Sequence, residues 1–313
     1  MDAYNQLPTM DVTGTVDVSN PQAVCEAVNA ILSARYPDFD AALISRLYRD
    51  FAALYSGNFP GFYACDTAYH DMQHVLDVSL ATARLIDGYE AAQVSVRIDA
   101  DLAVTAIIVA LFHDAGYIRT RGVGVVSHGA QYTKTHVTRS ARFMAHYLPM
   151  IGLRDRVPLA GKLVHFTGYE IRPEDIELDN KAQRQVGYLV GTADVVAQMA
   201  DAGYLEKCRD RLYPEFVVGG IARQRQSDGS VNVVYSSAED LLLKTPAFIR
   251  ATLEGRLTEQ FGGLYHLLAN HFGGRNLYME ALERNCRHLE TLLEQNNPQL
   301  LRESLVLPQA QRR

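Results

Sequence analysis

The stretch AVTAIIVALF runs from Ala103 to Phe112 without a charged side chain and ends directly on His113-Asp114. A helix of this composition is apolar on every side, so it belongs in the interior of a fold. An imidazole and a carboxylate at its end are then buried, which costs several kcal/mol unless a partner satisfies them. The sequence therefore predicts a helical interior with a polar site at the end of this helix.

Two other apolar helical stretches carry groups of the same kind. YHDMQHVLDV places His70 and His74 four residues apart, on one side of a helix. LVGTADVVAQMA contains Asp194 between apolar residues. Any one of these groups is most simply a core residue with a satisfied hydrogen bond. Together, imidazole nitrogens and carboxylate oxygens form a ligand set that suits Zn, Fe, Mn or Mg.

Hydrophobic periodicity predicts helices along most of the chain. Asn20 followed by Pro21 combines a capping side chain with a proline suited to a first turn, and so predicts a helix start. We predict helices at about 21–34, 41–55, 71–89, 99–116, 131–150, 158–169, 181–201, 204–216, 248–272 and 276–295. A loop with three glycines is predicted over 119–129, and a short hairpin around Asp228-Gly229 over 219–235.

This pattern predicts an all-α protein with a single domain over residues 19–313. The polar, unpatterned residues 1–18 predict a loose N-terminal arm. Residues from about 236 to 295 form a predicted C-terminal helical extension, whose aromatic side chains recur at helical spacing. Such a stripe is typical of core packing or of a homodimer contact, and less often of a platform for a nucleobase.

Composition excludes several classes of partner. The chain has 313 residues and a formal net charge of −6, so no basic field favours nucleic acid or an anionic membrane. We expect no membrane-spanning helix and no secretion signal at MDAYNQLPTMDVTG. The four cysteines are scattered without a CxxC pair, which favours reduced thiols and a cytoplasmic location.

The order of the polar groups resembles a known family. His74, His113-Asp114 and Asp194 follow the H…HD…D order of the HD superfamily of metal-dependent phosphohydrolases, over roughly residues 63–215. The resemblance implies an HD-type, phosphodiesterase-like helical bundle in which these four residues hold a divalent metal ion.

The first motif also resembles the YHNxxHxxDV signature of cyclic-nucleotide phosphodiesterases. The resemblance implies that His70 is the general acid and that His74 binds metal. Asp71 replaces the asparagine of that signature, and HDAGY replaces the family's HDxDH, so that Tyr117 stands near the missing third histidine. Tyr69, Tyr117 and Gln198, which lies one helical turn after Asp194, are candidate substrate contacts.

Two further histidines match the binuclear members of the superfamily. His136 opens a stretch similar to the HxxxSA helix that follows the HD pair in many members, and His165 interrupts the next apolar stretch. The order H…HD…H…H…D of the HD-GYP phosphodiesterases implies that both hold a second ion, with Asp114 bridging the two. Hydrogen-bonded helix histidines remain an alternative for each.

The predicted reaction is hydrolysis of a small phosphorylated substrate by a metal-activated hydroxide. Protonated His70, steered by Asp71 or Asp77, would donate a proton to the leaving alkoxide, with Asp114 part of the catalytic centre. A cyclic nucleotide-like phosphodiester or a nucleotide phosphomonoester is the expected substrate. The alternatives are a di-iron oxygenase on the same ligand set and a non-catalytic nucleotide-binding HD domain.

Overall fold

The computed structural model describes residues 7–122, 126–295, 300–302 and 305, and the fold is all-α. The α-helices are α1 Pro21–Arg35, α2 Ala41–Tyr55, α3 Met72–Ala91, α4 Ala100–Phe112, α5 His136–Met150, α6 Val157–Leu163, α7 Lys181–Ala200, α8 Tyr204–Lys207, α9 Tyr213–Val218, α10 Ala238–Ala251, α11 Leu268–His271 and α12 Leu277–Glu294. The 3-10 turns are η1 Ala115–Tyr117, η2 Gly129–Tyr132, η3 Arg154–Arg156, η4 Val164–Thr167, η5 Pro173–Asp175, η8 Leu264–Leu267 and η9 Leu300–Arg302. Two π-helical segments are η6 Cys208–Leu212 and η7 Thr252–Gln260, and the strands are β1 Arg223–Arg225 and β2 Val231–Val233.

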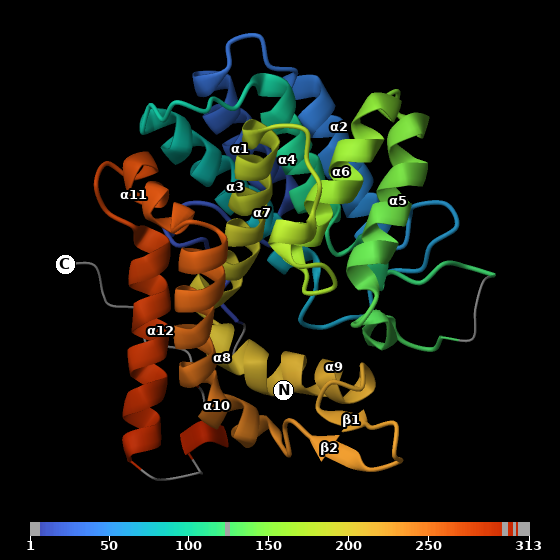
Figure 1. Cartoon of the computed structure of the whole chain (residues 1–313), viewed down its shortest axis with the longest axis vertical. Coiled ribbons are helices and arrows are strands. Elements are labelled where there is room, and N and C mark those ends of the chain that lie inside the picture. The colour runs from blue at the N-terminus through green and yellow to red at the C-terminus, as the bar shows by residue number, and fades with distance from the viewer. Residues whose placement is uncertain (1–6, 123–125, 296–299, 303–304, 306–313) are drawn as a thin grey trace, which may run out of the picture.

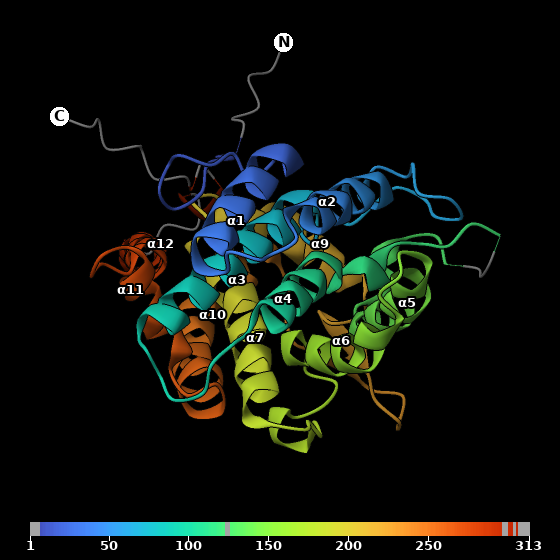
Figure 2. The same cartoon turned by 90° about the horizontal axis from the view of Figure 1, so that it is seen from above.

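Helices α3, α4 and α7 pack against one another at the centre of the molecule (Figure 1). In both views α5 and α6 lie on one side of this centre and α11 and α12 on the other (Figure 2). Every residue of α4 from Ala103 to Phe112 is buried, as its uniformly apolar sequence predicts. Ala100–Tyr117 is the one described segment long and apolar enough to cross a membrane, but 83% of it is buried within the fold. It is therefore a core helix here.

Helix starts follow the capping signals in the sequence. Asn20 accepts hydrogen bonds from the backbone of the first turn of α1, with Pro21 at a first-turn position. Asp71 caps α3 by accepting from the amide of His74, and Asp99 caps α4 in the same way. Each cap satisfies a backbone donor that the helix itself leaves unpaired. The predicted starts near these residues are confirmed.

Helix ends near the HD pair differ from the predictions. The helix predicted over 99–116 ends at Phe112, because the chain leaves helical geometry at Asp114 (φ −103°, ψ 6°) and continues as the short turn η1. The helix predicted over 131–150 begins only at His136, after the separate turn η2. The helix predicted over 158–169 tightens into the 3-10 turn η4 after Leu163. Apolar periodicity extends across these breaks and so conceals them.

The predicted and observed helix bounds differ most clearly in the C-terminal part of the chain. A single helix over 248–272 is wrong: α10 begins at Ala238, after the capping side chain of Ser237, and continues into the π-helical η7. That run stops before Gly262 and Gly263, which both have positive φ (67° and 71°). The predicted hairpin is confirmed as β1 paired antiparallel with β2.

The loose arm predicted over residues 1–18 is wrong for its described part, residues 7–18. Met10 and Asp17 form an isolated antiparallel bridge, and Val18 is buried. The Asp11 carboxylate accepts a hydrogen bond from buried Arg84, so it neutralises a cation inside the fold. A short polar segment held by one ion pair has no periodicity from which this could be predicted. Residues 1–6 lie outside the described residues.

Gly116 is a position where the fold requires glycine. A Cβ on Gly116 would lie 1.9 Å from the backbone oxygen of His136, at the first turn of α5. We expect Gly116→Ala to lower the free energy of unfolding by about 3 kcal/mol, because the backbone of α5 must move. Gly161→Ala in α6, where a Cβ meets nothing within 4 Å, is the control and should change stability by less than about 1 kcal/mol. Equal urea midpoints for the two variants would contradict the prediction.

Candidate metal centre and cavity

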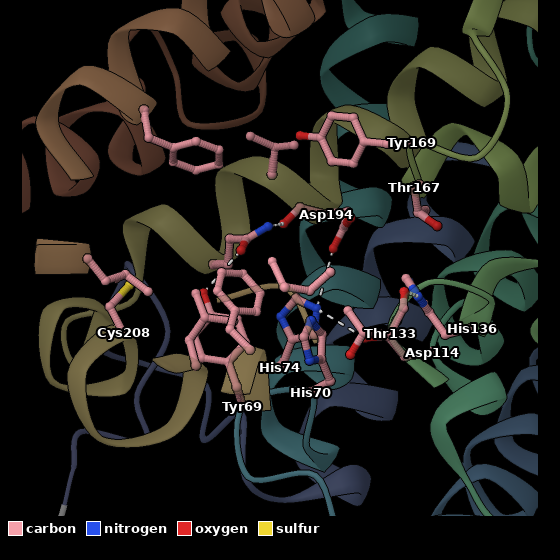
Figure 3. Close-up of a pocket in the computed structure, with 18 of the residues that line it drawn as sticks. Tyr69, His70, His74, Asp114, Thr133, His136, Thr167, Tyr169, Asp194 and Cys208 are labelled. Carbon is pink, nitrogen blue, oxygen red and sulfur yellow. Dashed lines mark hydrogen bonds and ion pairs between the residues drawn. The ribbon is translucent and has the colours of Figure 1, made fainter. Parts of the chain in front are cut away.

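A cavity of about 460 Å³ opens beside the end of α4. This volume lies within the roughly 300–1,000 Å³ typical of small-molecule sites. Its walls come from α3, η1, α5, α7, the segment from α8 to α9, and α10 with η7. Figure 3 shows His74 joined by dashed lines to Asp114 and Asp194, with Tyr169 beyond Asp194 in the same view. Segments distant in sequence thus supply a single concave site.

Four side-chain atoms from three helical regions converge beside the cavity. His74 Nε2 lies 3.3 Å from Asp194 Oδ1 and 3.5 Å from Asp114 Oδ2. His113 Nε2 lies 3.3 Å from Asp114 Oδ2 and 3.5 Å from Asp194 Oδ1. Ligand atoms at about 2.1 Å from a common ion are roughly 3 to 3.5 Å apart, so these spacings match a single divalent cation. The predicted ligands His74, His113, Asp114 and Asp194 are therefore brought together.

The orientation of His113 also fits a metal. Its Nδ1–H donates to the backbone oxygen of Ala110 at 2.8 Å, which leaves the Nε2 lone pair directed at the cluster. His113 Nε2 and Asp114 Oδ2 are both buried and find no hydrogen-bond partner among the described residues. Two buried acceptors that face each other need a proton or a metal cation between them. The donor set and its unsatisfied atoms therefore fit a divalent ion.

The charges of the cluster point the same way. Burial raises the pKa of Asp114 and of Asp194, but the neighbouring imidazoles, His113 first, hold both pKa values well below their ordinary range. Burial lowers the pKa of His113, and the charge of Asp114 with its contacts raises it well above its ordinary value. Both carboxylates are thus held ionised in the interior, where positive charge must balance them.

Packing between the HD turn and α5 holds the pair in place. Ser140 of α5 donates its hydroxyl to the backbone oxygen of His113 and accepts from the amide of Gly116 at 2.8 Å. Ser140 is fully buried. The motif similar to HxxxSA therefore has a structural role here, because its serine ties α5 to the turn that carries the ligands.

His136 faces the other oxygen of Asp114. Its Nε2 lies 3.7 Å from Asp114 Oδ1, while its Nδ1–H donates to the backbone oxygen of Thr133 at 2.7 Å. Burial lowers the pKa of His136, which favours the neutral imidazole that binds metals. Asp114 thus presents one oxygen to the four-atom cluster and the other to His136, an arrangement compatible with a bridging carboxylate.

His165 is not brought to the cavity. It lies in η4, is absent from the cavity walls, and its Nδ1 is buried without a hydrogen-bond partner among the described residues. The adjacent Phe166 instead packs against α7, where a Cβ on Gly187 or Gly191 would meet its ring or backbone oxygen. Because Phe166 takes the position facing α7, its neighbour His165 points elsewhere. The predicted ligand set is therefore assembled without His165.

His70 is paired with a carboxylate that sequence reasoning missed. His70 Nδ1–H donates to Glu215 Oε2 at 2.7 Å, and the other oxygen of Glu215 accepts from the amide of Tyr69. Glu215, in α9, is only 3% exposed. It lies 145 residues from His70, in the unremarkable stretch YPEFVV, so no local pattern pointed to it. Its presence inside an apolar helix was the available signal.

The predicted partners of His70 have other contacts. Asp71 caps α3 and forms an ion pair with Arg211 at 3.0 Å. Asp77 is buried, and its nearest charged groups are Asp201 and Arg84, away from the cavity walls. Burial raises the pKa of Asp77 to about 8. The prediction that Asp71 or Asp77 steers His70 is therefore wrong, and Glu215 occupies that place.

Tyr69, Tyr117 and Gln198 all line the cavity. The ring of Tyr117 stacks against both His70 and His136, with its centroid 4.5 Å from each. Tyr69 donates its hydroxyl to Gln198 Oε1 at 3.0 Å, and Gln198 Nε2 donates to the backbone oxygen of Asp194 at 3.2 Å. Tyr117 thus fixes two imidazoles in place, while Tyr69 and Gln198 form one hydrogen-bonded wall.

Comparisons with protein-family models, curated proteins and solved structures found no match to this chain.

Proposed function

We propose that this protein is a metal-dependent phosphoester hydrolase of the HD type. One observation carries the proposal: the Nε2 atoms of His74 and His113 each lie 3.3–3.5 Å from both Asp114 Oδ2 and Asp194 Oδ1, and two of these four atoms lack any hydrogen-bond partner among the described residues. The cluster borders a cavity large enough for a small substrate. The HD-like order of the same residues in the sequence supports this family in preference to other metal-binding proteins.

In this proposal His74, His113, Asp114 and Asp194 hold a divalent cation, with Mg, Mn, Fe and Zn as candidates. Such an ion supplies Lewis-acid charge stabilisation and lowers the pKa of a coordinated water. A second ion would lie between His136 and the free oxygen of Asp114, with solvent completing its ligands.

His70 would act as the general acid. Its Nδ1 proton is committed to Glu215, so the ring must carry its transferable proton on Nε2. Burial lowers the pKa of His70, and the hydrogen bond to Glu215 with the charge of Asp114 raises it above its ordinary value. The acid form is thereby favoured near neutral pH, and stacking on Tyr117 restricts the ring. Glu215 thus positions His70 and stabilises its positive charge.

The substrate we propose is a small phosphorylated molecule, with a cyclic nucleotide-like phosphodiester or a nucleotide monophosphate as first candidates. The aromatic part of the cavity wall supports a flat or apolar group beside the phosphate, since Phe216 and Tyr235 line the cavity and stack on each other at 5.7 Å. All four cysteines are free, which fits the proposed cytoplasmic location. A homodimer through the C-terminal helices remains part of the proposal.

The test combines metal analysis with a phosphoester screen. Protein purified without chelator should contain at least one divalent ion per chain and should hydrolyse a phosphoester when supplied with Mg, Mn, Fe or Zn. The panel should include cyclic nucleotides, nucleoside monophosphates and non-nucleotide diesters. Oxygen consumption with iron and no phosphate release would instead support the oxygenase, and tight nucleotide binding without turnover would support a sensor.

A further inference from the structure

Arg256 is a buried cation in the wall of the same cavity. It belongs to the π-helical segment η7 and is 6% exposed. Within the described part of the chain, no carboxylate oxygen lies within 4.0 Å of its guanidinium. A buried charge without an opposite charge is costly, so its retention in a cavity wall calls for a reason. π-Helical segments are themselves frequent at functional sites.

The hydrogen bonds of Arg256 leave most of its donors unused. Nη2 donates to the backbone oxygens of Phe166 and Gly168, both at 2.8 Å. Nε is buried and has no partner among the described residues, and no described residue accepts from Nη1. The guanidinium is thus fixed through Nη2, while Nε and Nη1, on opposite sides of the group, find no acceptor among the described residues. A guanidinium N–H without a partner is a strong donor to carboxylate or phosphate oxygens.

The surroundings hold the guanidinium beside α7, the helix that carries Asp194. The backbone oxygen of Phe166, which Arg256 binds, lies against α7 at Gly191, one turn before Asp194. A Cβ at Gly191 would come within 2.5 Å of that oxygen, so glycine permits the approach. The ring of Tyr169 covers the guanidinium at 4.2 Å and shields it from solvent. Tyr169 and Asp194 both line the cavity and lie near each other in the view of Figure 3.

The other basic side chains of the cavity differ from Arg256. Lys244 is exposed, and its amine already donates to Asp240 and to the backbone oxygen of Val234. Lys134 is exposed as well. Solvated or paired amines add little to the binding of an anion. Arg256 is therefore the cation best prepared to contribute.

We propose that Arg256 is an anion-binding residue of the cavity, which donates Nη1–H to a phosphate oxygen of the ligand. The assignment to substrate rests on the proposed hydrolase function. The phosphate is either the group that is cleaved or a second phosphate of the same molecule. Tyr169 acts as the cover that keeps water from the guanidinium.

The first experiment measures binding of inorganic phosphate to metal-free protein by calorimetry, so that no metal ion contributes. We expect Arg256→Met to weaken phosphate binding about 10- to 100-fold, because it removes a charge-assisted hydrogen bond. Arg256→Lys should fall between, since it keeps the charge without the planar guanidinium. Lys244→Met, which removes a basic side chain from the same cavity, should remain within about twofold of the wild type.

The second measurement avoids the risk that Arg256→Met disturbs the fold through η4. In wild-type protein, the ¹⁵N–¹H resonance of Arg256 Nε, identified by its absence from the Arg256→Lys spectrum, should shift on phosphate titration. Unchanged affinity in Arg256→Met together with an unshifted Nε resonance would overturn the inference. Neither readout needs turnover or metal. The anion-binding inference can therefore fail while the hydrolase proposal stands, and the hydrolase proposal can fail while the anion-binding inference stands.

With active enzyme, a third measurement distinguishes the two phosphates. If Arg256 binds the phosphate that is cleaved, Arg256→Met should lower kcat/KM for every substrate alike. If it binds a second phosphate, KM should rise only for substrates that carry one, and singly phosphorylated substrates should be unaffected. Either pattern supports anion binding and assigns its place.

Discussion

Replacing His113 with alanine should remove the bound metal ion and lower kcat/KM by at least about 10³-fold. The ion would contribute several kcal/mol of charge stabilisation, and each 1.36 kcal/mol is about tenfold in rate. His113 supplies one of the four clustered atoms, and its loss leaves Asp114 and Asp194 ionised in the interior with one partner fewer. Elemental analysis measures the metal content, and steady-state kinetics measure kcat/KM.

The matched control is His146→Ala, because His146 is an exposed histidine of α5 outside the cavity walls. It should keep full metal content and rate. Added metal should raise the melting temperature of the wild type and not of His113→Ala, since a ligand at 100 times its Kd stabilises by about 2.7 kcal/mol. A His113→Ala protein with one tightly bound ion per chain would refute the metal centre described above.

The second large effect concerns His70. His70→Ala should lower kcat by ~10²- to 10⁴-fold, the contribution of a positioned general acid, while the metal content stays at the wild-type value. His70 is hydrogen-bonded to Glu215 and not to the four-atom cluster. The substitution should therefore lower kcat without lowering the metal content. Loss of metal on this substitution would mean that His70 is a ligand and that the acid lies elsewhere.

Glu215→Gln provides the complementary variant. The hydrogen bond to Glu215 raises the pKa of His70, so its removal should lower that pKa. The protonated acid is then lost at a lower pH, and the alkaline limb of the kcat profile should move to lower pH. A variant whose rate falls while its pH profile is unchanged would assign Glu215 a purely structural role, through its contact with the Tyr69 amide.

Much of the metal cluster could be predicted from the sequence because its members interrupt apolar helices. His74, His113 and Asp194 each follow or divide a run of buried residues, and such residues must find partners inside the fold. The helices themselves follow from periodicity and from caps such as Asn20 and Asp99. These signals are local, so they can be read without knowledge of what packs on what.

His165 and Glu215 show where local reasoning ends. His165 has the same sequence signal as His136, yet a change to 3-10 geometry and the packing of Phe166 on α7 direct it away from the cavity. Glu215 has no partner within reach in sequence, and only the folding of α9 beside the start of α3 joins it to His70. The direction in which His165 points from its helical turn decides the first case. The packing of two helices distant in sequence decides the second.

The sequence by itself therefore determined that the chain is all-α, that its interior contains imidazoles and carboxylates, and where most helices begin. The tertiary structure decided which of those groups meet, which faces away, and that Arg256 lies in the cavity wall with no carboxylate partner among the described residues. The physical reason is that the two depend on interactions over different separations along the chain. Helix formation depends on residues within a few turns, whereas the composition of a site depends on packing between segments more than a hundred residues apart.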